Sequence, residues 1–352
     1  MTIDPQDSTA RSSLVDHDIS SNDISAPISS STVASNLTSS DLKQMTSNPR
    51  ASKSRTPGFI AFPLAVVLTL GTSAGLYSAS AQLTGFELAA ISRNVDEPLE
   101  IGALLGWRVF ELIVNWNSGF DYWDTASLTL LTNSSYYILL PLFYSISPVS
   151  VLLSLTIDVF STTLPFFLLR TLNSYNDSHH PNQALTTSST KLYISTFCTV
   201  IYAAILYANL QTFLPSYIIS TFDSIRSLEA AHAASLPILL TACLPLGNAA
   251  KDFLFTPSTF NAKSGVEIEF DPKTATLGET FAYNMGLSGW GKREDVLLGR
   301  TTLLVLLTVG NGLAKIWGTI EGAEIGGAIG WGTVFAVAHA VAGAGIGYVG
   351  DV

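Results

Sequence analysis

The feature that most constrains this chain is a series of apolar segments, each about long enough to cross a lipid bilayer. A helix needs about 20 predominantly apolar residues to cross about 30 Å of hydrocarbon. Since lipid cannot satisfy backbone N–H and C=O groups, such segments are expected to be helical. The sequence therefore predicts an all-α integral membrane protein, a polytopic bundle of about seven or eight transmembrane helices. The predicted spans are residues 59–80, 98–116, 126–146, 149–169, 192–214, 231–250, 301–317 and 325–349.

The composition fits a protein that uses lipid as part of its solvent. Hydrophobic residues make up 47% of the chain and charged residues only 12%, whereas about 25% of the residues in soluble domains are charged. The net charge of −10 is not gathered in one run, so no nucleic-acid partner is expected. Cys198 and Cys243 lie inside apolar segments and are interpreted as packing residues. The expected partners are the bilayer and another membrane protein or a second copy of the chain.

The chain is expected to contain two domains. Residues 1–57 are rich in Ser, Thr, Asp and Asn and nearly free of aromatic residues, which predicts a disordered cytosolic tail. The chain begins with polar residues rather than a signal peptide, so the first span is expected to act as its own insertion signal. Residues 58–350 form the transmembrane domain, with a cytosolic loop at 251–300. Within this loop, residues 266–270 alternate apolar and acidic side chains, which predicts either a short strand or an isolated extended loop.

The number of spans depends on residues 98–116, PLEIGALLGWRVFELIVNW. Each of the two mid-segment charges, Arg108 and Glu111, costs about 2.5 to 3.5 kcal/mol at a helix centre. If the segment spans and the N-terminus is cytosolic, thirteen Lys and Arg residues, Arg300 among them, lie on the cytosolic side, against Arg93 and Arg226 outside. This positive-inside bias favours eight spans with both termini cytosolic. The alternative is an amphipathic helix lying in the interface; the sequence does not indicate which membrane it is.

Glycines at four-residue spacing predict how the helices pack. Small residues at this spacing let membrane helices approach closely. The alternative interpretation is a flexible hinge, because Gly is conformationally permissive. The run that contains Gly318 is expected to begin in the turn before the last span. The helix-packing candidates are Gly71, Gly75, Gly102, Gly106, Gly322, Gly326, Gly330, Gly343 and Gly347.

Polar residues within the spans are the candidate functional residues, because an ionisable group in a membrane is costly and usually functional. Arg108 and Glu111 are three residues apart and can pair on one helix face. Asp158 is expected to pair with Arg108 or with Lys315. Such a pair either fixes helix register or belongs to a proton or substrate path. The candidates are Arg108, Glu111, Asp158, Asn311, Lys315 and His339, of which the last is expected either to titrate or to form a hydrogen bond between helices.

The sequence leaves three classes of function open. It contains no H-E-x-x-H, G-x-S-x-G or C-x-x-C motif, so neither a catalytic residue nor a metal or cofactor is expected. A transporter or channel that uses the intramembrane polar residues is favoured. The alternative is a non-catalytic membrane scaffold or assembly subunit that packs through its glycine faces. A membrane-embedded enzyme is the third reading.

Overall fold

The computed structural model describes residues 57–82, 86–173, 175–176, 188–264, 275–287 and 292–350. All of these residues belong to one compact unit, Pro49–Val352. Within them the chain is helical and forms no strand beyond two isolated bridges, Ser92 with Ile320 and Phe222 with Ala323. The predicted disordered tail, up to Thr56, and the strand predicted at 266–270 lie outside the described residues.

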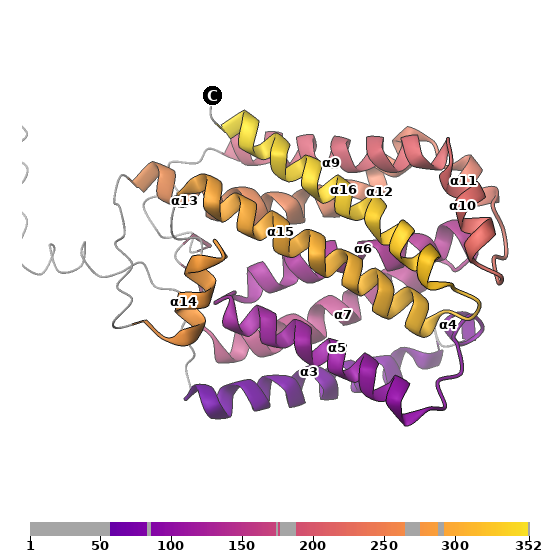
Figure 1. Cartoon of the computed structure of the whole chain (residues 1–352), viewed down its shortest axis with the longest axis horizontal. Helices are drawn as coiled ribbons and strands as arrows, with labels where there is room; N and C mark the ends of the chain where they lie inside the picture. The colour runs from indigo at the N-terminus through magenta and orange to yellow at the C-terminus, as the bar shows by residue number, and fades with distance from the viewer. Residues whose placement is uncertain are drawn as a thin grey trace, which may run out of the picture. The chain divides into compact units, whose positions relative to one another are not determined.

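Among the described residues, eight long helices run side by side, and shorter helices connect them at both ends (Figure 1). Two π-helical turns extend long helices: η2 (Lys251–Phe255) joins α12 to α13, and η3 (Gly312–Trp317) follows α15. The long helices are α3 (Gly58–Ser80), α5 (Pro98–Asn117), α6 (Tyr122–Phe143), α7 (Pro148–Leu169), α9 (Ser188–Leu210), α12 (Leu236–Ala250), α15 (Arg293–Asn311) and α16 (Ile325–Gly350). The short ones are α4 (Phe86–Ala89), α10 (Leu214–Thr221), α11 (Glu229–Ala233), α13 (Thr256–Ser264) and α14 (Leu277–Asn284).

In the part of the chain that the structure describes, six helical segments are long and apolar enough to cross a membrane. They are Phe59–Ser80, Pro148–Leu169, Ser188–Leu210, Leu236–Phe260, Arg293–Trp317 and Ile325–Val349. The predicted count of seven or eight is not reached by this criterion, because two further long helices are more polar. Helix α5 carries Glu100, Arg108 and Glu111, and α6 carries Asp124 and several buried Ser, Thr and Asn residues. The described part of the chain is thus all-helical, with six candidate membrane-spanning helices.

The seventh predicted span begins earlier than expected. It was predicted to start at residue 301, but α15 starts at Arg293. Glu294 and Asp295 lie in its first turn, where negative charge is favoured by the helix dipole. Arg300, counted above as a cytosolic loop charge, is therefore inside a helix and fully buried. The assignment of Arg300 to a loop was wrong, because the charge tally cannot show that a charged side chain has buried partners inside a helix. The cytosolic side of this residue stays a prediction.

Two other predicted boundaries change for local reasons. The span predicted at 126–146 begins at Tyr122, because the side chain of Asp121 caps α6 and accepts a hydrogen bond from the Asp124 N–H at 3.0 Å. The span predicted at 231–250 begins at Leu236, and Pro237 occupies the first turn, where its missing N–H does no harm. The predicted loop 251–300 begins with helix rather than loop, since α12 continues through η2 into α13.

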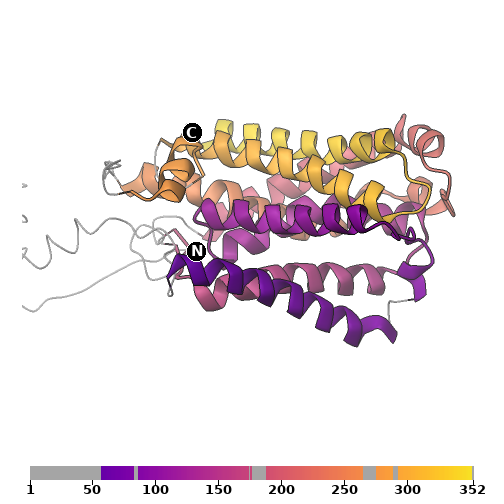
Figure 2. The same cartoon turned by 60° about the horizontal axis from the view of Figure 1, so that its bottom comes forward.

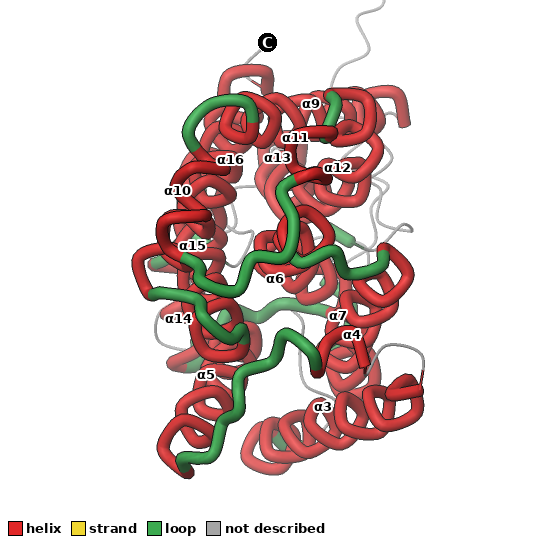
Figure 3. The backbone as a smooth tube through the Cα atoms, turned by 90° about the vertical axis from the view of Figure 1, so that its right-hand side faces the viewer, coloured by secondary structure: helices red, strands yellow, loops and turns green. Residues whose placement is uncertain are grey.

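Helix α6 occupies the middle of the bundle, as the end-on view in Figure 3 shows, and contacts α7, α12 and α15. It is buried along most of its length, including Thr132, Asn133 and Ser135. The Asn133 side chain donates to its own helix, to the carbonyl of Thr129 at 2.7 Å. Helix α3 packs along α7 (Figure 2). The surrounding helices thus shield the polar α6.

Glycines mark the tightest contacts between helices. Gly312 faces Gly332 where η3 packs on α16, and a Cβ at Gly312 would lie 3.3 Å from the Gly332 Cα. Gly247 of α12 lies directly against the α9 backbone at Ser195 and Thr199, leaving no room for a side chain. Among the predicted packing glycines, Gly330, Gly343 and Gly347 lie against Tyr217, Thr301 and Leu297, respectively. Gly318 faces Leu104, and Gly322 lies in the turn before α16 with a φ of 73° against Ser224.

At the other five predicted packing glycines, the described part of the chain leaves open space for a side chain. A Cβ at Gly71, Gly75, Gly102, Gly106 or Gly326 would have no other atom within 4 Å. Helix packing at these five positions stays a prediction, because glycine spacing makes close approach feasible but does not supply the neighbouring helix. The Gly326 carbonyl does accept a hydrogen bond from the Tyr217 hydroxyl of α10 at 2.7 Å.

Candidate functional site

The first polar cluster is built around Asp158, in the middle of α7. Its carboxylate accepts hydrogen bonds from the hydroxyls of Tyr77 (2.9 Å) and Tyr137 (2.8 Å), which come from α3 and α6. The third donor is the ammonium of Lys315, on η3, which also forms a salt bridge with Asp158. The Lys315 nitrogen lies 5.8 Å and 5.5 Å from the ring centres of Tyr136 and Tyr137. One carboxylate thus connects four segments of the bundle.

A second series of hydrogen bonds reaches Asp158 through Thr162. The Thr162 hydroxyl donates to the backbone carbonyl of Asp158 at 2.7 Å and accepts a hydrogen bond from Arg108. Arg108 pairs with Glu111 at 3.2 Å, on the same face of α5. The other oxygen of Glu111 accepts from the Asn311 amide at 2.7 Å, and the Asn311 oxygen accepts from the indole of Trp107 at 2.6 Å. We call the residues in these contacts the Asp158 network: Tyr77, Trp107, Arg108, Glu111, Tyr137, Asp158, Thr162, Asn311 and Lys315.

The Asp158 network is balanced in charge. It contains two cations and two carboxylates, in the pairs Arg108–Glu111 and Lys315–Asp158. Their side chains are only 8% to 21% exposed. Buried charges that are paired and hydrogen-bonded can hold helices in register. The network therefore joins α3, α5, α6 and α7 to α15 and η3.

The structure brings five of the six predicted polar residues together and leaves out His339. Arg108, Glu111, Asp158, Asn311 and Lys315 belong to the Asp158 network, whereas His339 forms a hydrogen bond through Nδ1 with the hydroxyl of Tyr202 at 2.8 Å. This contact joins α16 to α9, and both side chains are buried. His339 is a residue of a separate packed interface.

The second polar cluster was not predicted, and Arg300 is at its centre. Arg300 forms a salt bridge with Asp124 of α6 at 2.9 Å, and neither side chain is exposed. Its guanidinium also donates to the carbonyls of Phe253 (3.0 Å) and Leu287 (3.2 Å) and to the hydroxyl of Tyr175 (2.8 Å). The rings of Phe120, Tyr175 and Phe253 lie 4.9 to 5.2 Å from its central carbon, close enough for cation–π attraction.

The segment after α7 completes this cluster. Asp124 accepts hydrogen bonds from the Asn173 amide at 3.1 Å and from the Tyr175 hydroxyl. Asp121 accepts from the backbone N–H of Asn173 at 2.9 Å and from the side chain of Asn176. We call Asp121, Asp124, Asn173, Tyr175, Asn176 and Arg300 the Arg300 cluster. It joins α6 and α15 to the segment between α7 and α9.

Burial changes the acid–base properties at this end of the bundle. Burial and the neighbouring Asp124 raise the pKa of Asp121 to about 7, since removal from water disfavours the charged carboxylate. Burial lowers the pKa of Arg170, at the end of α7, to about 10. Arg170 donates to the carbonyls of Trp116 (3.1 Å) and Phe120 (2.9 Å), and its guanidinium stacks on the Trp116 ring. Arg170 therefore stays charged at neutral pH and holds the end of α5 in place.

Two features of the sequence could have indicated the Arg300 cluster. Asp121 followed three residues later by Asp124 is a helix N-cap pattern. It places the start of α6 four residues earlier than hydropathy does. The acidic pair Glu294–Asp295 similarly marks the start of α15. An earlier start of both helices moves Asp124 and Arg300 out of loops and into the bundle.

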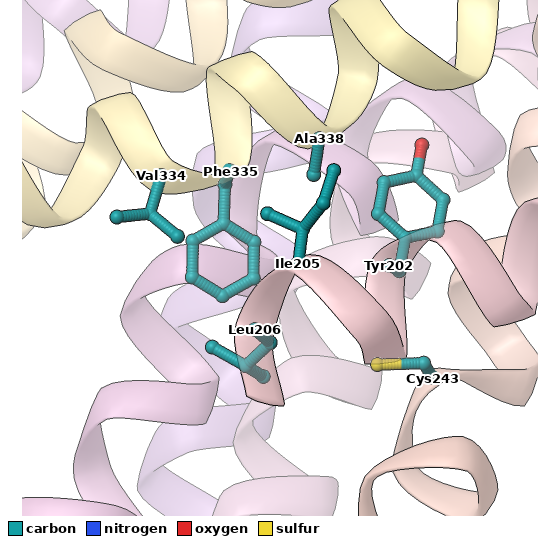
Figure 4. A pocket seen from close by; sticks show the side chains of 7 residues that line it. All are labelled: Tyr202, Ile205, Leu206, Cys243, Val334, Phe335 and Ala338. Atoms are coloured by element: carbon teal, nitrogen blue, oxygen red, sulfur yellow. The ribbon is translucent and has the colours of Figure 1, made fainter. Parts of the chain in front are cut away.

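One small cavity lies between α9, α12 and α16 (Figure 4). Its lining includes Tyr202, Ile205, Cys243, Phe335 and Ala338. Its free volume is about 10 Å³, the lower limit for a single water molecule. This cavity is too small for an organic substrate. Within the described ranges, no group of three or more His, Cys, Asp or Glu residues is placed to hold a metal ion.

A comparison with protein-family models matches residues 187–330 to the family described as Bouquet formation protein 3 C-terminal domain. No curated protein and no solved structure gave a significant match. The matched segment runs from α9 to the first turns of α16 and contains Arg300, Asn311 and Lys315. Their partners Asp124, Glu111 and Asp158 all precede it. Over this part of its length, less than half, the chain is similar to the Bouquet formation protein 3 C-terminal domain.

Proposed function

We propose that this protein is a non-catalytic membrane scaffold or assembly subunit that takes part in bouquet formation. The observation that carries the proposal is the pairing of its buried charges. Arg300 with Asp124 and Lys315 with Asp158 each join the matched segment to the helices that precede it. Pairs of this kind fix the arrangement of helices. The similarity of residues 187–330 to the Bouquet formation protein 3 C-terminal domain supports bouquet formation as the process in which the protein takes part.

The packing of the polar residues supports a scaffold better than a transporter. A transport path would need Arg108, Asp158 and His339 to line a common water-accessible cavity. His339 instead contacts Tyr202 in another interface, and the cavity beside that tyrosine holds at most one water molecule. The favoured sequence-based expectation of transport is therefore not supported.

In the proposed topology eight helices cross the membrane and both termini face the cytosol. Two further crossings come from α5 and α6, whose charged residues are paired rather than exposed to lipid. Arg108 and Glu111 compensate each other on α5, and Asp124 of α6 is neutralised by Arg300. Pairing of this kind lowers the penalty of placing a charge in a bilayer.

The test is to remove the protein from the cells that make it and to score bouquet formation. We expect bouquet formation to fail, and the native chain to restore it. Normal bouquet formation without the protein would overturn the proposal.

The double variant Asp158→Asn/Lys315→Gln separates a scaffold from a transporter. It removes both charges and keeps two polar side chains of similar size. A scaffold with this variant is expected to restore bouquet formation at matched protein levels, because replacing both members of a buried pair leaves no unpaired charge and can be neutral for the fold. A transporter that uses these charges would lose function, so failure at normal protein levels would favour transport.

A further inference from the structure

The short helix α14 crosses the direction of α15 at the end of the bundle where α5 ends (Figure 1). It starts with a complete capping box, in which Thr276 and Glu279 exchange hydrogen bonds with each other's backbone N–H groups. This arrangement satisfies two backbone N–H groups that would otherwise lack a partner, and it stabilises the short helix. Helix α14 is thus a defined element.

Contacts at both ends fix the level of α14 along the bundle. At its start, a Cβ at Gly278 would lie 3.5 Å from the carbonyl of Asn117, the last residue of α5. At its end, the Met285 backbone lies directly against Gly299 of α15. Leu287 follows and accepts a hydrogen bond from Arg300. Helix α14 therefore lies at the level where α5 ends and the apolar part of α15 begins.

Helix α14 has an apolar flank and a polar flank on either side of its contact with the bundle. The apolar flank consists of Leu277, Phe281 and Met285, four residues apart, which are 91%, 48% and 48% exposed. Ala282 is buried and marks the side that faces the bundle. At about 100° per residue, Glu279 and Tyr283 lie on the side of Ala282 opposite the apolar flank. An amphipathic helix of this kind lies parallel to a membrane surface with its apolar flank in lipid.

The candidate membrane span that α14 contacts also carries an exposed apolar residue near this contact. Leu298, in the second turn of α15, is 69% exposed at the level that α14 contacts. Lys292, just before α15, is also exposed. A lysine at the end of a membrane span can bind anionic lipid headgroups. If the apolar flank of α14 faced water, its three large apolar side chains would all be exposed to solvent.

We propose that α14 is an interfacial membrane anchor, whose Leu277, Phe281 and Met285 insert among the lipid headgroups and upper acyl chains. The occupant of this flank is the bilayer that the long helices cross. Because Leu287 ends the same turn and binds Arg300, this anchor also fixes one wall of the Arg300 cluster.

Site-directed spin labelling of the full chain in phosphatidylcholine vesicles tests this placement. Nitroxides are attached at Phe281→Cys and Met285→Cys on the apolar flank, and at Tyr283→Cys as the matched control on the polar flank. The native chain, whose two cysteines are buried, gives the background. Collisions with oxygen, which dissolves in lipid, are compared with collisions with a water-soluble nickel chelate.

We expect a severalfold higher ratio of oxygen to nickel collisions at 281 and 285 than at 283. A ratio in favour of nickel at 281 and 285 would show that the flank faces water and would overturn the proposal. Low collision rates with both reagents would show that protein covers the flank, which would also overturn it. Failure of the bouquet experiment would leave this result unaffected, because the measurement depends only on where α14 lies.

Discussion

Arg300 and Asp124 form a fully buried salt bridge at 2.9 Å although 176 residues separate them in the chain. The pair joins the central helix α6 to α15, and carbonyls from η2 and from the end of α14 complete the coordination of the guanidinium. A guanidinium carries five N–H donors in a fixed planar arrangement, and here they meet acceptors from four separate segments. The end of the bundle is therefore organised around one side chain.

Removal of Arg300 is expected to be among the most damaging single changes. Arg300→Met leaves Asp124 buried without a countercharge, and breaking a buried pair in this way costs about 3–5 kcal/mol. Arg300→Lys should also destabilise, because an ammonium cannot reproduce the planar set of donors. The loss of folded protein on heating in detergent measures both effects. The double variant Arg300→Met/Asp124→Leu should recover part of the loss, and no recovery would mean that the backbone contacts of Arg300 dominate.

The Lys315–Asp158 pair is expected to contribute less than the Arg300–Asp124 pair. Lys315 remains 21% exposed, whereas Arg300 is not exposed at all, so its charge is partly solvated. We expect Lys315→Met to reduce the free energy of unfolding by less than Arg300→Met does. A double-mutant cycle with Asp158→Asn should give a coupling of about 0.5–3 kcal/mol. A coupling of zero would show that the two tyrosines, rather than the lysine, satisfy Asp158.

The stability of the folded protein should depend on the ionisation of Asp121. Its pKa is raised to about 7 in the folded state from about 4 in an unfolded chain. Between pH 4 and pH 7 the folded state therefore holds more protons at this site, and the contribution of Asp121 to the free energy of unfolding falls as the pH rises through this window. Asp121→Asn keeps a side-chain oxygen to cap α6 and cannot titrate. Thermal unfolding of both proteins at several pH values should show a steeper decline for the native chain, and parallel curves would contradict the raised pKa.

Two glycines inside candidate membrane-spanning helices should respond differently to alanine. Gly247→Ala places a methyl group against the α9 backbone at Ser195 and Thr199, and overpacking of this kind typically costs 1–3 kcal/mol. Gly75→Ala has open space around the new methyl group and should be neutral or slightly stabilising, because Ala favours helix more than Gly. Comparing their unfolding in detergent with the native chain checks both. A destabilised Gly75→Ala would reveal a contact outside this chain.

The sequence alone could predict what depends on local properties. Segment length and apolarity identified the long helices, and the i,i+3 spacing of Arg108 and Glu111 was sufficient to expect their contact, which forms at 3.2 Å. The expected pairing of Asp158 with Lys315, one of two options, required only that both lie in spans. These inferences hold because helical geometry and the energetics of burial in lipid act over a few residues.

What the tertiary structure decided is which polar groups share a neighbourhood. Hydropathy placed Arg300 in a loop because one charged residue ends an apolar run, but Asp124, Tyr175 and two carbonyls make its burial favourable. His339 resembled Asp158 in its position within a span, yet it packs against Tyr202. Gly75 and Gly330 carry the same spacing signal, and only Gly330 has a neighbour, Tyr217. The physical reason is that the free energy of a buried charge or a close contact depends on partners supplied by distant segments, and a local pattern carries no information about which helices become neighbours.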